Sequence, residues 1–168
     1  ETPITMQEAD LAVLAGAMVS EGWAGKRIGF NNTDLEWFET VVMAWDRIIG
    51  GPRYLNQRTL PSGKELYSLD VHNSESFLQS PLAELYGARS ADKRIPSFVW
   101  KKPAAFKRHF LQSLFQGDGS SSLLPRNTMQ VSYSTRSQRL ASDIQTLLLE
   151  FGIVGRLSTS KRGEHKVV

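Results

Sequence analysis

Four segments of the chain space their apolar residues as amphipathic helices do. The predicted helices run over residues 5–22, 34–49, 103–117 and 137–151. Thr5 and Glu8 form a capping box at the start of the first helix, and Asp34 can cap the second. Gly22, Gly50 and Gly152 follow three of the predicted helices, which is typical of helix ends. A shorter helix, interrupted at Pro81, is expected within residues 74–86.

Short polar and β-branched segments between these helices predict strands. The clearest pair flanks Pro61-Ser62-Gly63 and predicts an antiparallel hairpin of residues 53–60 and 65–71. Residues 26–32 favour strand or turn. Further extended segments are expected at 93–100, 129–133 and 154–160, and a loop at 120–128.

The two halves of the chain repeat this order of elements. An offset of 97 places Leu14 on Leu111 and Glu21 on Asp118, and an offset of 102 relates the later helices. The difference between the offsets falls in the expected loop, where an insertion costs little. An internal duplication follows, with residues 1–100 as the first repeat and 101–168 as the second.

Composition narrows the class of protein. The 168 residues are 40% hydrophobic and 22% charged, as in a globular protein, and the absence of cysteine excludes disulfides and thiolate metal sites. The longest apolar run, Leu11–Val19, is too short to cross a membrane, so we expect a soluble cytoplasmic protein. The net charge of +3 combines 6 basic and 12 acidic residues up to Ala88 with 14 basic and 5 acidic residues after it. The basic second half favours a polyanionic partner.

Two acidic residues occupy equivalent positions at the ends of equivalent helices. These two helices could pack closely through their small residues, which are Gly16, Ser20, Ser113 and Gly117. Close packing would bring Glu21 and Asp118 to the same end of the helix pair. Two neighbouring carboxylates repel each other unless a cation lies between them, and divalent cations bound by carboxylates suit phosphodiester hydrolysis. Either acid taken alone reads as an ordinary solvated helix end followed by glycine.

Several motifs resemble the LAGLIDADG homing endonucleases. Leu14–Gly22 and Leu111–Gly119 are similar to the two nine-residue signatures of that family. Lys93–Phe98 resembles the Lys-x-Ile-Pro segment upstream of the second signature in intein-borne members, and Ser134–Leu157 resembles the segment that follows it. Together these likenesses cover nearly the whole chain.

The resemblance implies an α+β fold of two αββαββα repeats whose sheets form a saddle over the DNA major groove. It implies a monomer with pseudo-twofold symmetry that binds a long double-stranded DNA site and cuts both strands to leave 3′ overhangs. Glu21 and Asp118 would be the catalytic Mg²⁺ ligands, and Lys93 the active-site cation. By the repeat arithmetic the second repeat is truncated: it should lack its last strand, its final helix and its own basic active-site residue.

Outward side chains of the strands are the expected DNA contacts, because Arg, Lys, Asn and Gln can reach base edges from a sheet. Backbone and base contacts cannot be separated at this level. The candidates in the first repeat are Arg53, Asn56, Arg58, Lys64 and Tyr67. Those in the second repeat are Arg126, Gln130, Arg136, Arg156, Lys161 and Arg162.

Two departures from the family pattern leave an alternative open. The first signature ends in Glu21 instead of the usual aspartate, which keeps the charge and lengthens the side chain. The sequence shows no splicing residues, so in the full-length precursor the chain would be fused to an intein splicing domain. The alternative is a LAGLIDADG-like protein that binds DNA or RNA without cutting it, such as a maturase or a degenerate endonuclease.

Overall fold

The computed structural model describes residues 3–168, which form two compact units. The first unit comprises the chain up to Gly87 together with Pro96–Gly117, and the second comprises Ala88–Ile95 and Asp118–Val168. The chain therefore crosses from one unit to the other three times. The boundaries of the two units differ from those of the two sequence repeats, because the second signature helix belongs to the first unit and the segment from Ala88 to Ile95 to the second.

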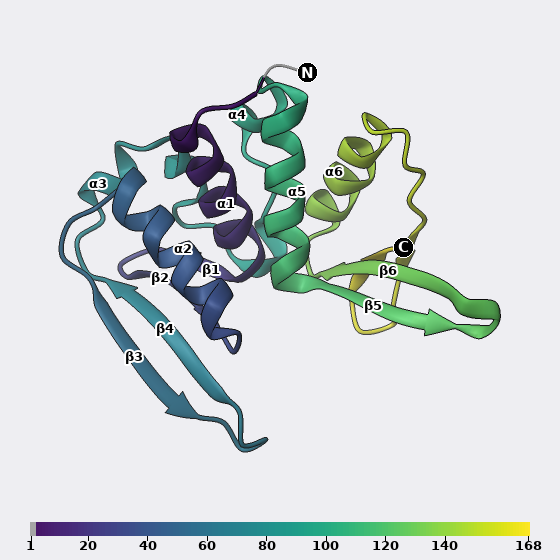
Figure 1. The fold of residues 1–168 in the computed structure, drawn as a ribbon, viewed down its shortest axis with the longest axis horizontal. Helices are drawn as coiled ribbons and strands as arrows, with labels where there is room; N and C mark the ends of the chain where they lie inside the picture. Colours follow the sequence, from purple (N-terminus) through teal and green to yellow (C-terminus); the bar gives the residue numbers. More distant parts are fainter. Residues whose placement is uncertain (1–2) are drawn as a thin grey trace. The chain divides into compact units, whose positions relative to one another are not determined.

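The first unit contains one four-stranded antiparallel sheet with helices on one face (Figure 1). The strand order is β1-β2-β4-β3. The elements of this unit are α1 (Met6–Glu21), β1 (Gly22–Ala24), β2 (Ile28–Asn32), α2 (Leu35–Ile48), β3 (Tyr54–Thr59), β4 (Glu65–Val71), α3 (Glu75–Leu78), η1 (Pro81–Leu85), α4 (Ser97–Trp100) and α5 (Ala104–Asp118), whose last residue belongs to the second unit.

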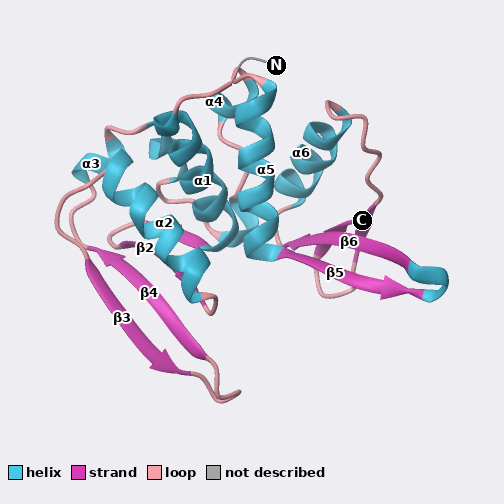
Figure 2. Cartoon of the chain, in the orientation of Figure 1, coloured by secondary structure: helices cyan, strands magenta, loops and turns pink. Residues whose placement is uncertain are grey.

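The second unit contains an equivalent antiparallel sheet of order β5-β6-β8-β7 (Figure 2). Its elements are η2 (Ser90–Asp92), β5 (Gly119–Leu124), η3 (Pro125–Asn127), β6 (Thr128–Thr135), α6 (Gln138–Leu149), β7 (Leu157–Thr159) and β8 (His165–Val167). The order α5-β5-β6-α6-β7-β8 repeats α1-β1-β2-α2-β3-β4. The expected α+β fold of two LAGLIDADG-type repeats is therefore confirmed.

The register of the strands shows how closely the two repeats correspond. In the first sheet Gly22 pairs with Phe30, which pairs with Leu69. In the second sheet Gly119 pairs with Tyr133, which pairs with Val167. Each of these rows begins at the glycine after a signature acid. The rows therefore give the residue correspondence between the repeats directly from hydrogen bonding.

The expectation that the second repeat lacks its last strand is wrong, because β7 and β8 complete its sheet. The Ser160 N–H donates to the Glu164 carbonyl at 2.8 Å, as the Leu60 N–H donates to the Lys64 carbonyl at 2.8 Å in the first repeat. Gly163 has a positive φ of 78° in this turn. Strand β7 falls within the extended segment expected at 154–160, whereas β8 was missed because three residues are too few to show a clear alternation.

Two further local expectations differ from the structure. The expected loop at 120–128 is largely strand, since β5 pairs with β6 along its whole length. Arg126 and Asn127 both adopt positive φ, which turns the chain tightly enough for a hairpin. The expected extended segment at 93–100 ends in the short helix α4, with Pro96 at its N-cap position.

Helix α1 is buried on nearly all sides, which explains its continuous apolar sequence. Thr5 caps it by accepting a hydrogen bond from the Glu8 N–H at 3.1 Å, as expected. The Glu8 carboxylate does not complete a reciprocal capping box, however. It binds the ammonium of Lys102 at 3.0 Å instead, which ties the start of α1 to the segment before α5.

Candidate active site and nucleic-acid interface

Helices α1 and α5 approach each other through small residues that correspond between the repeats. A Cβ atom added to Gly16 would lie 2.6 Å from the Ser113 Cβ, and one added to Gly117 would lie 2.6 Å from the Ser20 Cβ. Residues 16 and 113 are equivalent at the offset of 97, and so are residues 20 and 117. Each position therefore contacts its own equivalent, as a local twofold relation between the helices requires.

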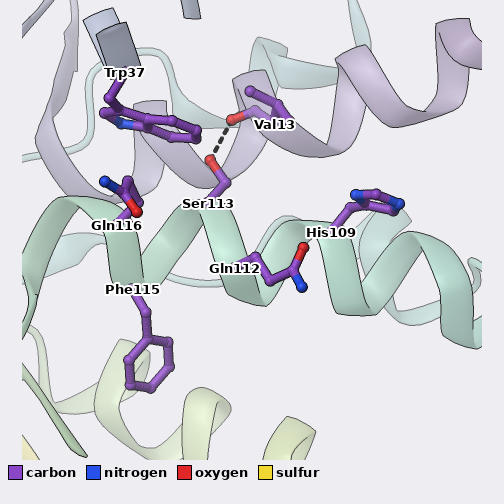
Figure 3. Close-up of a pocket in the computed structure, with 7 residues that line it drawn as sticks. All are labelled: Val13, Trp37, His109, Gln112, Ser113, Phe115 and Gln116. Carbon is purple, nitrogen blue, oxygen red and sulfur yellow. Dashed lines mark hydrogen bonds between the residues drawn. The ribbon is translucent and has the colours of Figure 1, made fainter. Parts of the chain in front are cut away.

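The two serines make the same hydrogen bond in opposite directions. The Ser113 hydroxyl donates to the Val13 carbonyl at 2.5 Å, three residues before the glycine that Ser113 faces (Figure 3). The Ser20 hydroxyl donates to the Leu114 carbonyl at 2.6 Å, again three residues before the facing glycine. Buried hydroxyls are thus satisfied across the helix pair, and the two backbones are held in register.

Glu21 is the last residue of α1 and is fixed by the end of β2. The side-chain amide of Asn32 donates to the Glu21 carboxylate at 2.6 Å. The side-chain oxygen of Asn32 also has a partner, because it accepts a hydrogen bond from the Asp34 N–H at 2.7 Å. Asn32 therefore has a defined orientation, and it presents Glu21 with a donor that stabilises the ionised carboxylate.

Asp118 ends α5 and is largely desolvated. Burial raises the pKa of Asp118 to about 6, although the charge of Lys93 and a hydrogen bond from Tyr133 both act to lower it. The Tyr133 hydroxyl lies 3.4 Å from the Asp118 carboxylate. A cation near this carboxylate would offset its desolvation, and carboxylate oxygens suit hard divalent cations such as Mg²⁺. The donor chemistry therefore fits the expected metal.

Lys93 lies in a segment that is held against α6. Its carbonyl accepts a hydrogen bond from the Ser137 hydroxyl at 2.5 Å, and Ser137 also caps α6. Two residues later the Ile95 N–H donates to the Asp143 carboxylate at 3.2 Å. These anchors place Lys93 close enough to Asp118 for its charge to act on the carboxyl pKa. Lys93 and Asp118 thus belong to one electrostatic site within the second unit.

The alternation of the first sheet sorts the candidate DNA contacts between two faces. Asn56 and Arg58 lie on the face away from the helices, as expected for DNA contacts, and Lys64 lies in the β3–β4 turn. Arg53 and Tyr67 share the helix-covered face instead. The Arg53 guanidinium binds the Asp46 carboxylate of α2 at 2.6 Å, which raises the pKa of Arg53. The Tyr67 ring packs 5.9 Å from Phe38.

The candidates of the second repeat lie at several places on the second unit. Gln130 lies on the β6 face that carries Ser132, and Arg126 lies in the β5–β6 turn. Arg136 follows β6, and Arg156 pairs with Val168 beside β7. Lys161 and Arg162 lie in the β7–β8 turn. All of these candidates therefore belong to the second unit.

Sequence reasoning missed four residues at or beside these sites. Asn32 and Tyr133 contact the two acids, and Asn31 and Lys166 lie on the faces of the sheets away from the helices. Only the strand register places Tyr133 at the position of Phe30, so the sequence carried no signal for its role. Lys166 lies in a strand too short to be predicted.

A separate pocket of about 470 Å³ lies beside α1 and α5 in the first unit (Figure 3). It includes neither signature acid, and its lining residues are Val13, Trp37, His109, Gln112, Ser113, Phe115 and Gln116. The indole nitrogen of Trp37 is buried without a hydrogen-bond partner among the described residues. Glutamines and apolar groups dominate this lining, so the pocket does not have the charge expected of a phosphate site.

Within residues 3–168, no group of three or more His, Cys, Asp and Glu residues is placed to hold a metal ion. An Mg²⁺ ion bound by either acid would take its remaining ligands largely from water and phosphate, as Mg²⁺ commonly does. None of the helices in the described part of the chain is long and apolar enough to cross a membrane.

Comparison with protein families and curated proteins identifies relatives of this chain. Residues 105–168 match the family model described as a LAGLIDADG-like domain. Over 167 residues, the chain is 56% identical to the DNA gyrase A protein of Mycolicibacterium flavescens and 52% identical to that of Mycobacterium gordonae. It is 29% identical to the replicative DNA helicase DnaB of a Synechocystis strain. These alignments cover 99%, 99% and 91% of the chain, but only 30%, 30% and 19% of those proteins.

Solved structures share the fold at low sequence identity. The N-terminal LAGLIDADG domain of DUF199/WhiA matches with a TM-score of 0.66 at 16% identity, over 99% of this chain and 77% of that one. The homing endonuclease I-WcaI bound to its DNA recognition sequence matches with a TM-score of 0.65 at 14% identity, over 98% and 76%. I-DmoI in complex with DNA and Mn gives 0.63 at 8% identity, over 96% and 89%. Residues 105–168 are thus similar to the LAGLIDADG-like domain family, within a chain that shares its fold with LAGLIDADG homing endonucleases.

Proposed function

We propose that this chain is the endonuclease part of an intein, which binds a long double-stranded DNA site and hydrolyses both strands with Mg²⁺. The observation that carries the proposal is the equivalence of Glu21 and Asp118. Each acid ends one helix of a pair whose Ser–Gly contacts and hydrogen bonds recur symmetrically. A duplicated site of this kind suits two chemically equivalent cuts, one on each strand.

The roles of the residues follow from their settings. Glu21 and Asp118 would hold the metal, which when bound would polarise a phosphoryl oxygen and lower the pKa of a bound water. Asn32 would orient the Glu21 carboxylate, and Tyr133 would donate to Asp118. Lys93 would stabilise negative charge that develops near Asp118. The 3′ overhangs, the monomeric state and the pseudo-twofold symmetry belong to this proposal, as does the cytoplasm as its place of action.

The intein origin is supported by the named relatives. The same segment aligns with proteins named for a gyrase and for a helicase, and it covers 30% of one and 19% of the other. A segment shared by proteins of such different names is best explained as an insertion into each of them. The rest of the longer protein would include the splicing domain to which this chain is fused.

Cleavage assays with the two acid variants test this function. The substrate is a duplex carrying the gyrase A gene of Mycolicibacterium flavescens with the coding sequence of the whole proposed intein removed, so that the two flanks of the insertion site are joined. In Mg²⁺ we expect a staggered double-strand break, and in EDTA none. Asp118→Asn and Glu21→Gln should bind the duplex and fail to cut it. Asp92→Asn and Glu39→Gln, which make the same changes at exposed carboxylates, should cut normally.

A second candidate function is DNA or RNA binding without cleavage. The chain shares its fold with the LAGLIDADG domain of WhiA. A common fold does not specify an activity, so binding without cleavage is compatible with this fold. Binding with no metal-dependent break by the parent chain would support this candidate. If Asp118→Asn cut the duplex as well as the parent chain, the proposal that both acids are needed for cleavage would be wrong.

A further inference from the structure

In each sheet, a row of side chains lies one residue along the strands from the row that is buried in the core. These two rows are equivalent between the sheets. In the first sheet the row is Asn31, Ser68 and Asn56, which are Cα partners across β2, β4 and β3. In the second sheet it is Ser134, Lys166 and Ser158, across β6, β8 and β7. The strands correspond one to one, so each residue of the first row has a counterpart in the second.

Both rows lie on the sheet faces that the helices leave uncovered. The core row of the first sheet contains Phe30 and Leu69, and that of the second contains Tyr133 and Val167, all of which are buried. Because successive side chains of a strand point to opposite faces, the next row points away from the core. Side chains in these rows are therefore partly or fully exposed.

The two rows carry different recognition chemistry. An asparagine amide presents a donor and an acceptor in fixed geometry, and it can pair with the N6 and N7 atoms of adenine. A serine hydroxyl can donate or accept, so it discriminates little between bases. Lysine is a flexible point charge that suits phosphate oxygens. The Asn-Ser-Asn row is thus suited to reading bases, and the Ser-Lys-Ser row to binding the backbone.

The net charges of the two units support the same division of roles. The first unit holds 10 basic and 12 acidic residues, a net charge of −2, and the second holds 10 basic and 5 acidic residues, a net charge of +5. Attraction to phosphate that is independent of sequence grows with the number of Lys and Arg residues that contact the backbone. The second unit is the one equipped to supply it.

We propose that the two sheets divide DNA recognition between them. The Asn31–Ser68–Asn56 row reads bases in its half of the duplex, while Lys166 and the basic second unit supply affinity that depends little on sequence. The inference rests on the proposed DNA-binding function. It adds that the protein reads the base sequence strictly in one half of the target site and loosely in the other.

Selection and binding with the intact chain test this division. A library of random duplexes is selected in Ca²⁺ to prevent cutting, and the enriched duplex is then measured by fluorescence anisotropy over a series of KCl concentrations. The variants are Asn56→Ala and Lys166→Ala. Gln57→Ala, on the opposite face of the same strand, and Lys101→Ala, an exposed lysine of the first unit, are the matched controls. Circular dichroism establishes that each variant is folded.

Different readouts are expected for the two variants. Asn56→Ala should lower the preference for one base pair by about 10-fold while leaving the slope of log affinity against log salt unchanged. Lys166→Ala should weaken every duplex alike and reduce that slope by about 0.9. The selected site should be strongly specified in one half and weakly in the other.

The reverse assignment would overturn the inference while leaving DNA binding intact. That outcome is a change of base preference in Lys166→Ala, or a uniform loss in Asn56→Ala with its base preference unchanged. Equal sequence information in both halves of the selected site would also overturn it. Failure of the parent chain to enrich any duplex would overturn the proposed function itself, so the two failures are distinguishable.

Discussion

Ser113 of α5 lies directly against Gly16 of α1, and its hydroxyl donates to the Val13 carbonyl at 2.5 Å. The contact leaves no room for a side chain at position 16, because an added Cβ would lie 2.7 Å from the Phe110 carbonyl oxygen as well. The close approach of these two helices therefore depends on a glycine that faces a serine. The stability of the first unit should be sensitive to this pair.

Gly16→Ala should destabilise the chain by about 1–3 kcal/mol, since overpacking forces the two helices apart. Urea unfolding followed by circular dichroism measures the loss. Gly25→Ala is the matched control, because a Cβ added at Gly25 meets nothing within 4 Å in the part of the chain that the structure describes. Equal midpoints for the two variants would contradict the importance of close packing here.

Replacing Asn32 should weaken metal binding without removing a ligand. Its amide holds the Glu21 carboxylate at 2.6 Å, and loss of a group that orients a metal ligand commonly costs about 10–100-fold in metal affinity. For Asn32→Ala we expect a rise of about 10-fold in the Mg²⁺ concentration needed for half-maximal cleavage. Thr135→Ala removes the side chain at the equivalent position of the second repeat and serves as a comparison. An unchanged Mg²⁺ requirement in Asn32→Ala would show that the amide does not orient a metal ligand.

The stability of the chain should depend on pH through Asp118. Because burial raises its pKa to about 6, the folded state binds this proton more tightly than the unfolded state does. The contribution of Asp118 to the free energy of unfolding should therefore fall as pH rises from about 4 to about 6, and then level off. Asp118→Asn removes this dependence. Above pH 6 it should be more stable than the parent by about 1–2 kcal/mol, after allowance for solvent screening.

Urea titrations at pH 4, 5, 6 and 7 check this expectation, with Asp92→Asn as the matched control. The control should follow the parent at every pH. If the stability difference between Asp118→Asn and the parent did not grow as pH rises from 4 to 6, Asp118 would be stabilised in its ionised form, contrary to its desolvated setting.

Tyr133→Phe should raise the pKa of Asp118 further. The Tyr133 hydroxyl lies 3.4 Å from the carboxylate and favours its ionised form, so its removal leaves desolvation less opposed. The fold should tolerate the change, since Phe30 occupies the equivalent place in the first sheet. Carbon-13 NMR titration of the Asp118 carboxyl group gives the pKa in both proteins. An unchanged or lower value would show that the hydroxyl does not act on this carboxyl.

Periodicity, capping residues and turn glycines are local features, and they accounted for most of the helices and the β3–β4 hairpin. Thr5, Asp34 and Ser137 each cap the helix expected after them. Strand β7 lies within the extended segment expected at 154–160, but β8 was not predicted, because three residues are too few for an alternation to show. The positive φ of Arg126 likewise had no signal in the sequence, since such a conformation is rare outside glycine.

The sequence by itself determined the duplication, because a helix with small residues and a terminal acid recurs at an offset of 97 and the later helices recur at an offset of 102. Only the tertiary structure decided which groups surround each acid. Asn32 reaches Glu21 and Tyr133 reaches Asp118 because strand pairing brings the end of one hairpin to the end of a helix. The burial that raises the pKa of Asp118 is likewise a property of packing. Such contacts join residues separated along the chain, so neither periodicity nor composition carries them.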